Sequence, residues 1–257
     1  MENNFYNIFD SHAHYDDKWF DEDREVLLSS MKENGVCGIV NNAVDLKTAK
    51  VCIDFCEKYD FMYGAVGFHP ENLEDMPNDY LDRVAELLKH KKIVAVGETG
   101  LDYHWDISKD LQNRVFEEQI KLSLDVNMPI IVHDREAHGD TLNYLRKYKP
   151  KALVHCFSGS VEMMREVIRY GSYISLGGVV TFKNARHSVE VAKEVPIDRL
   201  LLETDCPYMS PVPFRGKRCD STMIKYTAEK IAEIRNTDVQ ELLNITAENA
   251  KRFYGID

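Results

Sequence analysis

A single rhythm runs through this chain: a short apolar run, a few polar residues, then an amphipathic stretch of helical periodicity. Runs of this kind, rich in Val, Ile and Leu and too short for helices, form strands that are buried on both faces of a parallel sheet. The eight apolar runs are Tyr6–Phe9, Cys37–Val40, Met62–Val66, Ile93–Val96, Pro129–Val132, Ala152–Val154, Tyr173–Leu176 and Leu200–Leu202.

The stretches between and after these runs have the spacing of amphipathic helices, with apolar residues on one side. They lie at residues 22–34, 46–59, 80–90, 112–126, 141–148, 162–170, 185–194, 222–235 and 239–254. Gly35 ends the first of them. Thr237 and Gln240 have the spacing of a capping box at the start of the last, and Gly255 follows its end.

Eight strand–helix units predict an α/β chain that forms one (β/α)8 TIM barrel of the metal-dependent hydrolase type, with residues 1–257 as a single domain. Barrels of this class take about 250 residues. A doubly wound open sheet is the alternative, and it normally has a Gly-rich phosphate-binding turn after its first strand. The corresponding residues here are Asp10-Ser11-His12-Ala13-His14, which favours the barrel.

Composition limits how such a barrel could act. The formal net charge is −11, which excludes binding of nucleic acid by a broad basic surface alone. The longest apolar stretches fall far short of the ~18 residues that a membrane span needs. Six cysteines at irregular spacings suggest reduced thiols, so we expect a cytoplasmic protein with no membrane association and no evident obligate protein partner.

Metal-type side chains follow six of the eight apolar runs. In a barrel the carboxyl ends of all strands meet at one rim, where active sites lie. Two histidines that are two residues apart on an extended chain can point at the same ion. The residues at these ends are His12, His14, His69, Glu98, His133, His155 and Asp205. Burying so many imidazoles and carboxylates together without a cation would cost several kcal/mol per group.

This set of donors predicts a divalent-metal site. Imidazoles with carboxylates and no thiolate suit Zn²⁺, Mn²⁺, Fe or Co more naturally than Mg²⁺. The candidates are too many for one tetrahedral ion, so a site for two ions is expected, with Glu98 as the natural bridge. His90 and His187 fall on predicted helices and are interpreted as solvated, whereas His104 and His138 are expected in loops near the rim.

Taken together, these segments resemble the successive motifs of the TatD family of metal-dependent deoxyribonucleases, in the family's order and over nearly the whole chain. The segments are Phe9-Asp10-Ser11-His12-Ala13-His14, Gly67-Phe68-His69-Pro70, Gly97-Glu98-Thr99-Gly100-Leu101-Asp102-Tyr103, Ile131-Val132-His133-Asp134-Arg135-Glu136-Ala137, His155-Cys156-Phe157-Ser158-Gly159 and Leu202-Glu203-Thr204-Asp205-Cys206-Pro207. Residues 211–218 and 246–253 extend the match.

The resemblance implies a TIM barrel of the amidohydrolase type that binds two divalent metal ions. By position, His12, His14, Glu98 and Asp205 would hold one ion. His133 and His155 would hold the second, shared through Glu98. His69 would contact a phosphate or donate a proton. The implied activity is hydrolysis of phosphodiester bonds in DNA, often from the 3′ end, usually supported by Mg²⁺, although Zn²⁺, Mn²⁺ or another transition metal is compatible with the ligands.

The chemistry expected of this arrangement is attack by a hydroxide that bridges the two ions, with Asp205 as general base and Glu98 as the essential bridging carboxylate. Arg135 and Arg215 are predicted phosphate contacts. Tyr103 is a candidate for stacking on exposed bases, together with Trp105, Phe157, Phe182 and Phe214. Without a continuous basic surface, the expected substrate is a short single strand or a 3′ end of DNA.

Two other functions remain open at this point. The same water could attack a carbonyl, which would make the protein a metal-dependent amide or ester hydrolase such as a D-aminoacyl-tRNA deacylase. Alternatively, the barrel could bind metal without catalysis; loss of one ligand would be its usual signature, and here all six ligand positions are filled.

Overall fold

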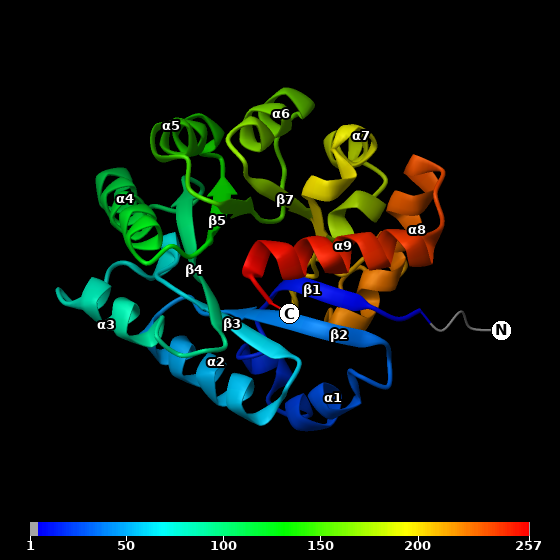
Figure 1. The fold of residues 1–257 in the computed structure, drawn as a ribbon, viewed down its shortest axis with the longest axis horizontal. Coiled ribbons are helices and arrows are strands. Elements are labelled where there is room, and N and C mark those ends of the chain that lie inside the picture. Colours follow the sequence, from blue (N-terminus) through cyan, green and yellow to red (C-terminus); the bar gives the residue numbers. More distant parts are fainter. Residues whose placement is uncertain (1–4, 257) are drawn as a thin grey trace.

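The computed structural model describes residues 5–256, so residues 1–4 and 257 of the predicted domain lie outside the described residues. Eight parallel strands pair in chain order from the first to the eighth (Figure 1). They are β1 (Ile8–Ala13), β2 (Val36–Asn42), β3 (Met62–Val66), β4 (Ile93–Asp102), β5 (Ile130–Arg135), β6 (Ala152–Val154), β7 (Tyr173–Leu176) and β8 (Leu200–Leu202).

Helices follow the strands and pack around the outside of this sheet (Figure 1). They are α1 (Arg24–Ser30), α2 (Leu46–Lys58), α3 (Tyr80–Leu87), α4 (Lys109–Asp125), α5 (His138–Tyr148), α6 (Val161–Arg169), α7 (Arg186–Glu194), α8 (Ile224–Arg235) and α9 (Val239–Tyr254). Short 3-10 turns lie at Lys18–Phe20, Pro70–Asn72, Gly178–Thr181, Ile197–Arg199 and Ser221–Met223. Within residues 5–256, no helix is long and apolar enough to cross a bilayer.

The sheet curls until its first and last strands meet. An isolated parallel bridge joins Ala13, at the end of β1, to Cys206, just after β8. A doubly wound sheet reverses its strand order at a switch point, whereas this order runs without reversal. The (β/α)8 barrel predicted from the sequence is therefore confirmed, and the open-sheet alternative is wrong.

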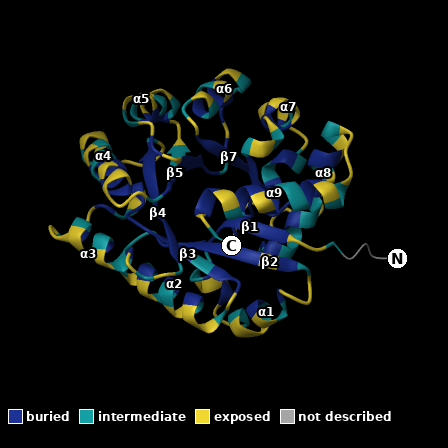
Figure 2. Cartoon of the chain, viewed as in Figure 1, coloured by how far each residue is buried: buried dark blue, intermediate teal, exposed yellow. Residues whose placement is uncertain are grey.

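The strands divide the apolar core into two layers because alternate side chains point to opposite faces. In β8, Leu200 and Leu202 belong to the layer between sheet and helices, whereas Leu201 belongs to the layer inside the barrel. The alternation in β6 is the same, with Leu153 inside. Figure 2 shows the strands largely buried and the helices exposed on their outer sides.

The last helix, α9, closes the amino-terminal end of the barrel. Its Phe253 and Tyr254 pack against the inner layer, and the Asn249 side-chain amide donates to the carbonyl of Leu200 at the start of β8. The helix begins one residue later than the predicted cap implies: Asp238, not Thr237, accepts from the backbone N–H of Glu241. The opposite, carboxyl end of the barrel is left open for a site.

β4 is longer than predicted. The sequence suggested that it ends at Val96, but it continues to Asp102 because Thr99 to Asp102 pair with Val132 to Arg135 of β5. This pairing brings the backbones of β4 and β5 close together at Gly100. Gly100 has φ of +146°, and a Cβ atom there would lie 2.0 Å from the His133 carbonyl oxygen, so only glycine fits. Glu98 therefore projects from a strand rather than from a loop.

Candidate metal centre

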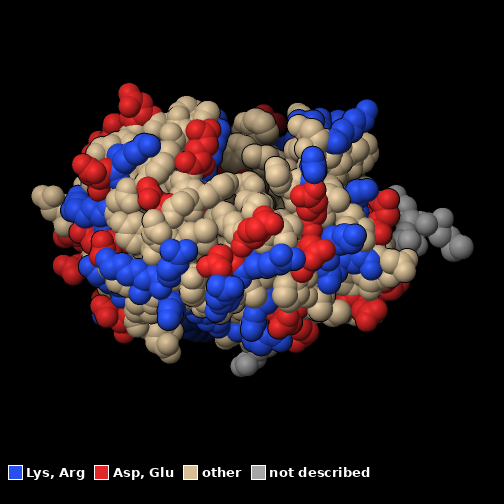
Figure 3. Space-filling model, turned by 90° about the horizontal axis from the view of Figure 1, so that it is seen from above, with Lys and Arg blue, Asp and Glu red and all other residues tan. Residues whose placement is uncertain are grey.

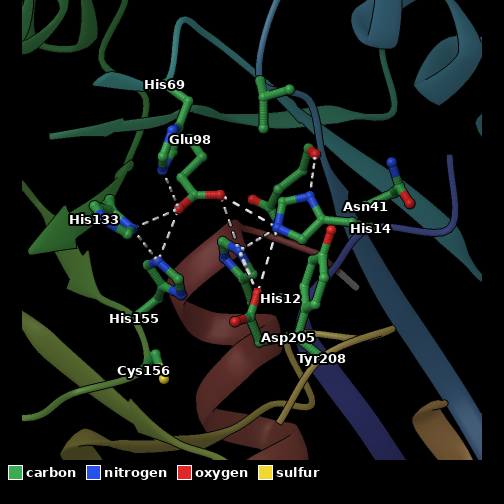
Figure 4. A network of polar contacts seen from close by, with 12 residues as sticks. His12, His14, Asn41, His69, Glu98, His133, His155, Cys156, Asp205 and Tyr208 are labelled. Atoms are coloured by element: carbon green, nitrogen blue, oxygen red, sulfur yellow. Dashed lines mark hydrogen bonds and ion pairs between the residues drawn. The ribbon is translucent and has the colours of Figure 1, made fainter. Parts of the chain in front are cut away.

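All six predicted metal ligands, and His69, come together at the carboxyl end of the barrel (Figure 4). They line or underlie a cavity of about 670 Å³, a size that is usual for small-ligand sites. Glu98 is buried at the centre of the group, and the imidazoles of the other strands point toward its carboxylate (Figure 4).

One group of ligands faces a single oxygen of Glu98. The Nε2 atoms of His12 and His14 lie 3.2 and 3.3 Å from Glu98 Oε2 and 3.0 Å from each other. Asp205 Oδ1 lies 3.4 Å from His14 Nε2 and 3.7 Å from His12 Nε2. Two imidazole nitrogens and two carboxylate oxygens thus converge on one small volume.

A second group faces the other oxygen. His155 Nε2 lies 2.9 Å and His133 Nδ1 3.1 Å from Glu98 Oε1, and these two nitrogens are 3.4 Å apart. Each oxygen of the Glu98 carboxylate therefore belongs to a different set of nitrogens. A carboxylate in this arrangement can bridge two cations.

Neighbouring groups hold two of these rings so that the correct nitrogen faces the site. His14 Nδ1 lies 2.9 Å from the Asn42 carbonyl oxygen, which only accepts, so Nδ1 carries the proton and Nε2 faces inward. His133 Nε2 donates to Asp102 Oδ2 at 2.9 Å, which turns Nδ1 inward. Hydrogen bonds of this kind orient metal-binding histidines and raise their basicity.

His69 differs from the other histidines. Its Nε2 lies 3.3 Å from Glu98 Oε1, and together with Glu98 and His133 it offers atoms close enough to hold an ion. However, its Nδ1 accepts the backbone N–H of Glu71 at 3.2 Å, and burial lowers the pKa of the ring. The neutral ring therefore carries its proton on Nε2, which makes it a donor toward the cavity rather than a ligand.

The charges of the side chains in the site favour the binding of cations. Burial by itself raises the pKa of Glu98, but the imidazoles, first His155, outweigh burial and hold the pKa well below its usual range. Burial lowers the pKa of His14, yet its bonds to the Asp205 and Glu98 carboxylates raise it well above the usual value. The pKa of His155 is raised in the same way by Glu98. Protons on these rings occupy positions that cations would take.

The backbone after β8 places Asp205 beside β1. Asp205 adopts a left-handed φ of +56°, which Asp tolerates better than most residues. Its N–H donates to the His12 carbonyl at 3.0 Å, and the N–H of His14 donates to the Cys206 carbonyl at 2.8 Å. The contact that closes the barrel therefore also assembles three of the ligands.

Glu203 is a site residue whose role sequence reasoning missed. It is fully buried, its Oε1 accepts the N–H of Cys156 at 2.7 Å, and its Oε2 accepts the Ser175 hydroxyl. His155 Nδ1 lies 3.8 Å from the same carboxylate. Glu203 thereby positions the segment that carries His155. A carboxylate that directly follows the apolar strand Leu200–Leu202, two residues before Asp205, was the signal that could have found it.

The predicted substrate contacts separate into two pairs. His69 and Arg135 line the cavity, whereas Tyr103 and Arg215 do not. The Tyr103 hydroxyl donates to Asp140 at 2.7 Å, and the Arg215 guanidinium lies 4.2 Å from the centre of the Phe182 ring. The structure thus engages these two side chains elsewhere, and we assign them no contact in the cavity.

The structure also shows which of the other aromatic and histidine side chains lie at the cavity. Phe157 is buried and Phe214 packs on Tyr226, so neither is free to stack on a base; Trp105 is 48% exposed and lines the cavity. His138 begins α5 instead of lying in a loop, and its Nδ1 lies 2.8 Å from Asp134 Oδ2.

Comparison with known proteins agrees with this geometry. Residues 9–255 match the family model described as TatD related DNase. The chain belongs to the TatD family. A Bacillus subtilis relative named as the uncharacterized metal-dependent hydrolase YabD is 46% identical over 97% of this chain and 100% of its own length. The crystal structure of YJJV, a TatD homolog from Escherichia coli K12, has 28% identity and a TM-score of 0.90 over 98% of this chain and 99% of that one.

The TatD relatives are metal-dependent hydrolases, and this chain is one as well. A human relative is named 3'-5' RNA nuclease TATDN2; it is 28% identical over 97% of this chain, which covers 35% of the human protein. The donor set fits divalent cations, because inward-facing imidazole nitrogens lie 2.9 to 3.4 Å from carboxylate oxygens of Glu98 and Asp205.

We predict that metal binding releases protons from this site. His14 and His155 have pKa values well above the usual value, so both rings are protonated in the metal-free protein at pH 7, and a ligand nitrogen must lose its proton. Metal affinity should therefore rise with pH and fall below neutrality. Titration calorimetry in two buffers of different ionisation enthalpy should show net release of protons at pH 7. Affinity that stays constant between about pH 6 and 8 would contradict this.

Removing the carboxylate behind His133 should weaken metal binding. Asp102→Ala leaves the Nε2–H of His133 without its acceptor, so we expect affinity at the second ligand group to fall by about 10- to 100-fold. Metal titration of the purified variant, beside an Asp106→Ala control in the loop after β4, measures the loss. Equal affinity for variant and control would show that Asp102 does not orient the ring.

Proposed function

We propose that this protein is a nuclease that uses two divalent metal ions to hydrolyse phosphodiester bonds of single-stranded nucleic acid, with DNA attacked from its 3′ end as the first expectation. The observation that carries the proposal is the Glu98 carboxylate, whose two oxygens each face a separate pair of imidazole nitrogens. Divalent cations held by these two sets of nitrogens would stabilise the charge that develops during displacement at phosphorus.

The residues of the first group, His12, His14 and Asp205, would hold one ion, and His133 with His155 would hold the other, with Glu98 shared. When bound, such ions lower the pKa of a shared water and offset negative charge on the phosphate. Mg²⁺ is the expected activating ion by resemblance to the family, whereas the imidazole-rich donor set favours Mn²⁺ or Zn²⁺.

Two side chains of the chain itself are suited to move protons. The Asp205 carboxylate, whose pKa is held below its usual value by the His14 bond despite burial, is ionised at neutral pH and can accept the proton of the attacking water. The neutral His69 ring presents Nε2–H to the cavity and can donate to the oxygen that leaves phosphorus. The new bond to phosphorus forms as the ester bond breaks.

The surface charge supports a substrate held at a few phosphates. On the side of the barrel that Figure 3 shows, Lys and Arg are interspersed with Asp and Glu. Arg135 lines the cavity and can meet a phosphate with two parallel hydrogen bonds. A cytoplasmic location is part of the same proposal, supported by six cysteines that are all unpaired in the structure.

Replacing the central carboxylate should abolish activity. Glu98→Ala removes the group shared by both sets of ligands, so kcat/KM on single-stranded DNA should fall by more than ~10³, about 4 kcal/mol. End-labelled DNA and RNA strands are incubated with metal-stripped protein after adding back Mg²⁺, Mn²⁺ or Zn²⁺. Shortening from the 3′ end by the wild type alone supports the proposal.

The same experiment separates the alternatives. Intact DNA and RNA in every metal, with hydrolysis of an aminoacyl-tRNA ester, would replace the nuclease by an ester hydrolase. Near-normal cleavage by Glu98→Ala with metal retained would remove Glu98 from the mechanism.

His69→Ala should separate proton donation from metal binding. Because His69 Nδ1 is occupied by the Glu71 N–H, the variant should keep both metal affinities while kcat falls by about 10²- to 10⁴-fold. Metal content and kcat are measured on the same preparation. Loss of one equivalent of metal would instead make His69 a ligand.

A further inference from the structure

Two exposed aromatic rings lie side by side, and one of them, Tyr208, lines the cavity. The indole of Trp19 is 50% exposed and the ring of Tyr208 is 46% exposed. Their centres are 6.1 Å apart and their planes are inclined by 47°. They come from distant parts of the chain, the 3-10 turn at Lys18–Phe20 and the loop after β8. Large aromatic side chains left in water next to an active site mark a binding surface.

Polar contacts fix the two loops to each other. Arg218 binds Asp23 through both guanidinium ends, at 2.6 and 2.7 Å, and donates to the Trp19 carbonyl at 2.8 Å. Asp17 accepts the Trp19 N–H with one oxygen and the Tyr208 hydroxyl with the other, both at 2.8 Å. The backbone under the indole is thus held from two sides. The rings themselves remain open to solvent.

The pair is continuous with the metal centre. The Tyr208 N–H donates to the Asp205 carbonyl at 2.9 Å, and Tyr208 lines the cavity beside the ligands (Figure 4). Trp105, in the loop after β4, and Arg135, at the end of β5, line the same cavity. β4 and β5 lie across the barrel from β1 and β8 in a sheet of eight strands. The cavity therefore has an aromatic edge on each side.

We propose that Trp19 and Tyr208 form a stacking platform for unpaired bases of the strand whose phosphodiester lies at Glu98. This inference rests on the proposed nuclease function and adds to it the part of the substrate that is recognised. Aromatic faces stack on any base, so the platform selects single strands over duplexes without selecting a sequence.

The charges around the rings decide which part of a strand lies there. Asp16 and Asp17 line the cavity next to Tyr208, and carboxylates repel phosphates while they accept hydrogen bonds from base amino and imino groups. Arg135 lies on the opposite edge, with its guanidinium 5.8 Å from the Trp105 ring centre. Bases therefore occupy the Trp19 edge, and the backbone passes toward Arg135.

Kinetics on matched strands test the platform. We expect Trp19→Ala and Tyr208→Leu to raise KM for a single-stranded oligothymidylate about tenfold, with kcat nearly unchanged, because stacking contributes to binding. Trp19→Phe and Tyr208→Phe should recover most of the loss, since each retains a ring. An abasic strand of equal length should give the same KM for the wild type and for both variants. Tyr6→Ala, which removes an aromatic side chain that is 56% exposed near the start of β1, is the control.

Fluorescence gives a readout that does not need turnover. The chain has two tryptophans, so in Trp105→Phe the emission comes from Trp19 alone. A phosphorothioate oligothymidylate, which resists hydrolysis, should quench this emission in the metal-loaded protein, and its abasic counterpart should not.

The outcomes separate this inference from the proposed function. If Trp19→Ala and Tyr208→Leu both cleave the strand with unchanged KM, the stacking platform is overturned and the nuclease function is not. Quenching of Trp19 without cleavage of any DNA or RNA keeps the platform and overturns the nuclease. Neither cleavage nor quenching overturns both.

Discussion

The buried carboxylate of Glu98 is the group on which the rest of the site depends. Its two oxygens lie within 3.3 Å of nitrogens from five histidines, which come from β1, β3, β5 and β6 or from the residues that follow them. So many imidazoles around one buried carboxylate are costly to hold together without cations. The arrangement becomes favourable when cations share the carboxylate, because each then neutralises charge and takes up nitrogen lone pairs.

The barrel makes this arrangement possible because one end supplies apolar packing and the other end carries the polar site. At the amino-terminal end, α9 supplies Phe253 and Tyr254 to the inner apolar layer, so packing there stabilises the closed sheet. At the carboxyl end the inner positions are polar, and the bond of the Asp205 N–H to the His12 carbonyl closes the ring of strands. Stability from one end thus maintains a polar cluster at the other that would not pack by itself.

Much of the fold and of the site could be predicted from the sequence, because the recurring apolar runs and the residues at their ends are local features. The order of the strands and the meeting of His12, Glu98 and Asp205 follow from them. Contacts that depend on how two segments meet in space could not be predicted in this way. The extension of β4 past Val96 depends on pairing with β5, and the Arg218–Asp23 ion pair joins residues that are far apart in the chain. Together with the bond from Arg218 to the Trp19 carbonyl, this ion pair supports the turn that carries Trp19.

Net charge is the clearest case in which a property of the whole chain says little about a site. A charge of −11 excludes capture of a polyanion by a general electrostatic field. It leaves open recognition at short range, where bound divalent cations would reverse the local sign and where stacking does not depend on charge. The cavity meets both conditions, with ligands for cations at its floor and exposed rings at its edges. For an acidic protein, base stacking together with contacts to a few phosphates is a way to recognise single strands that does not need a long basic track.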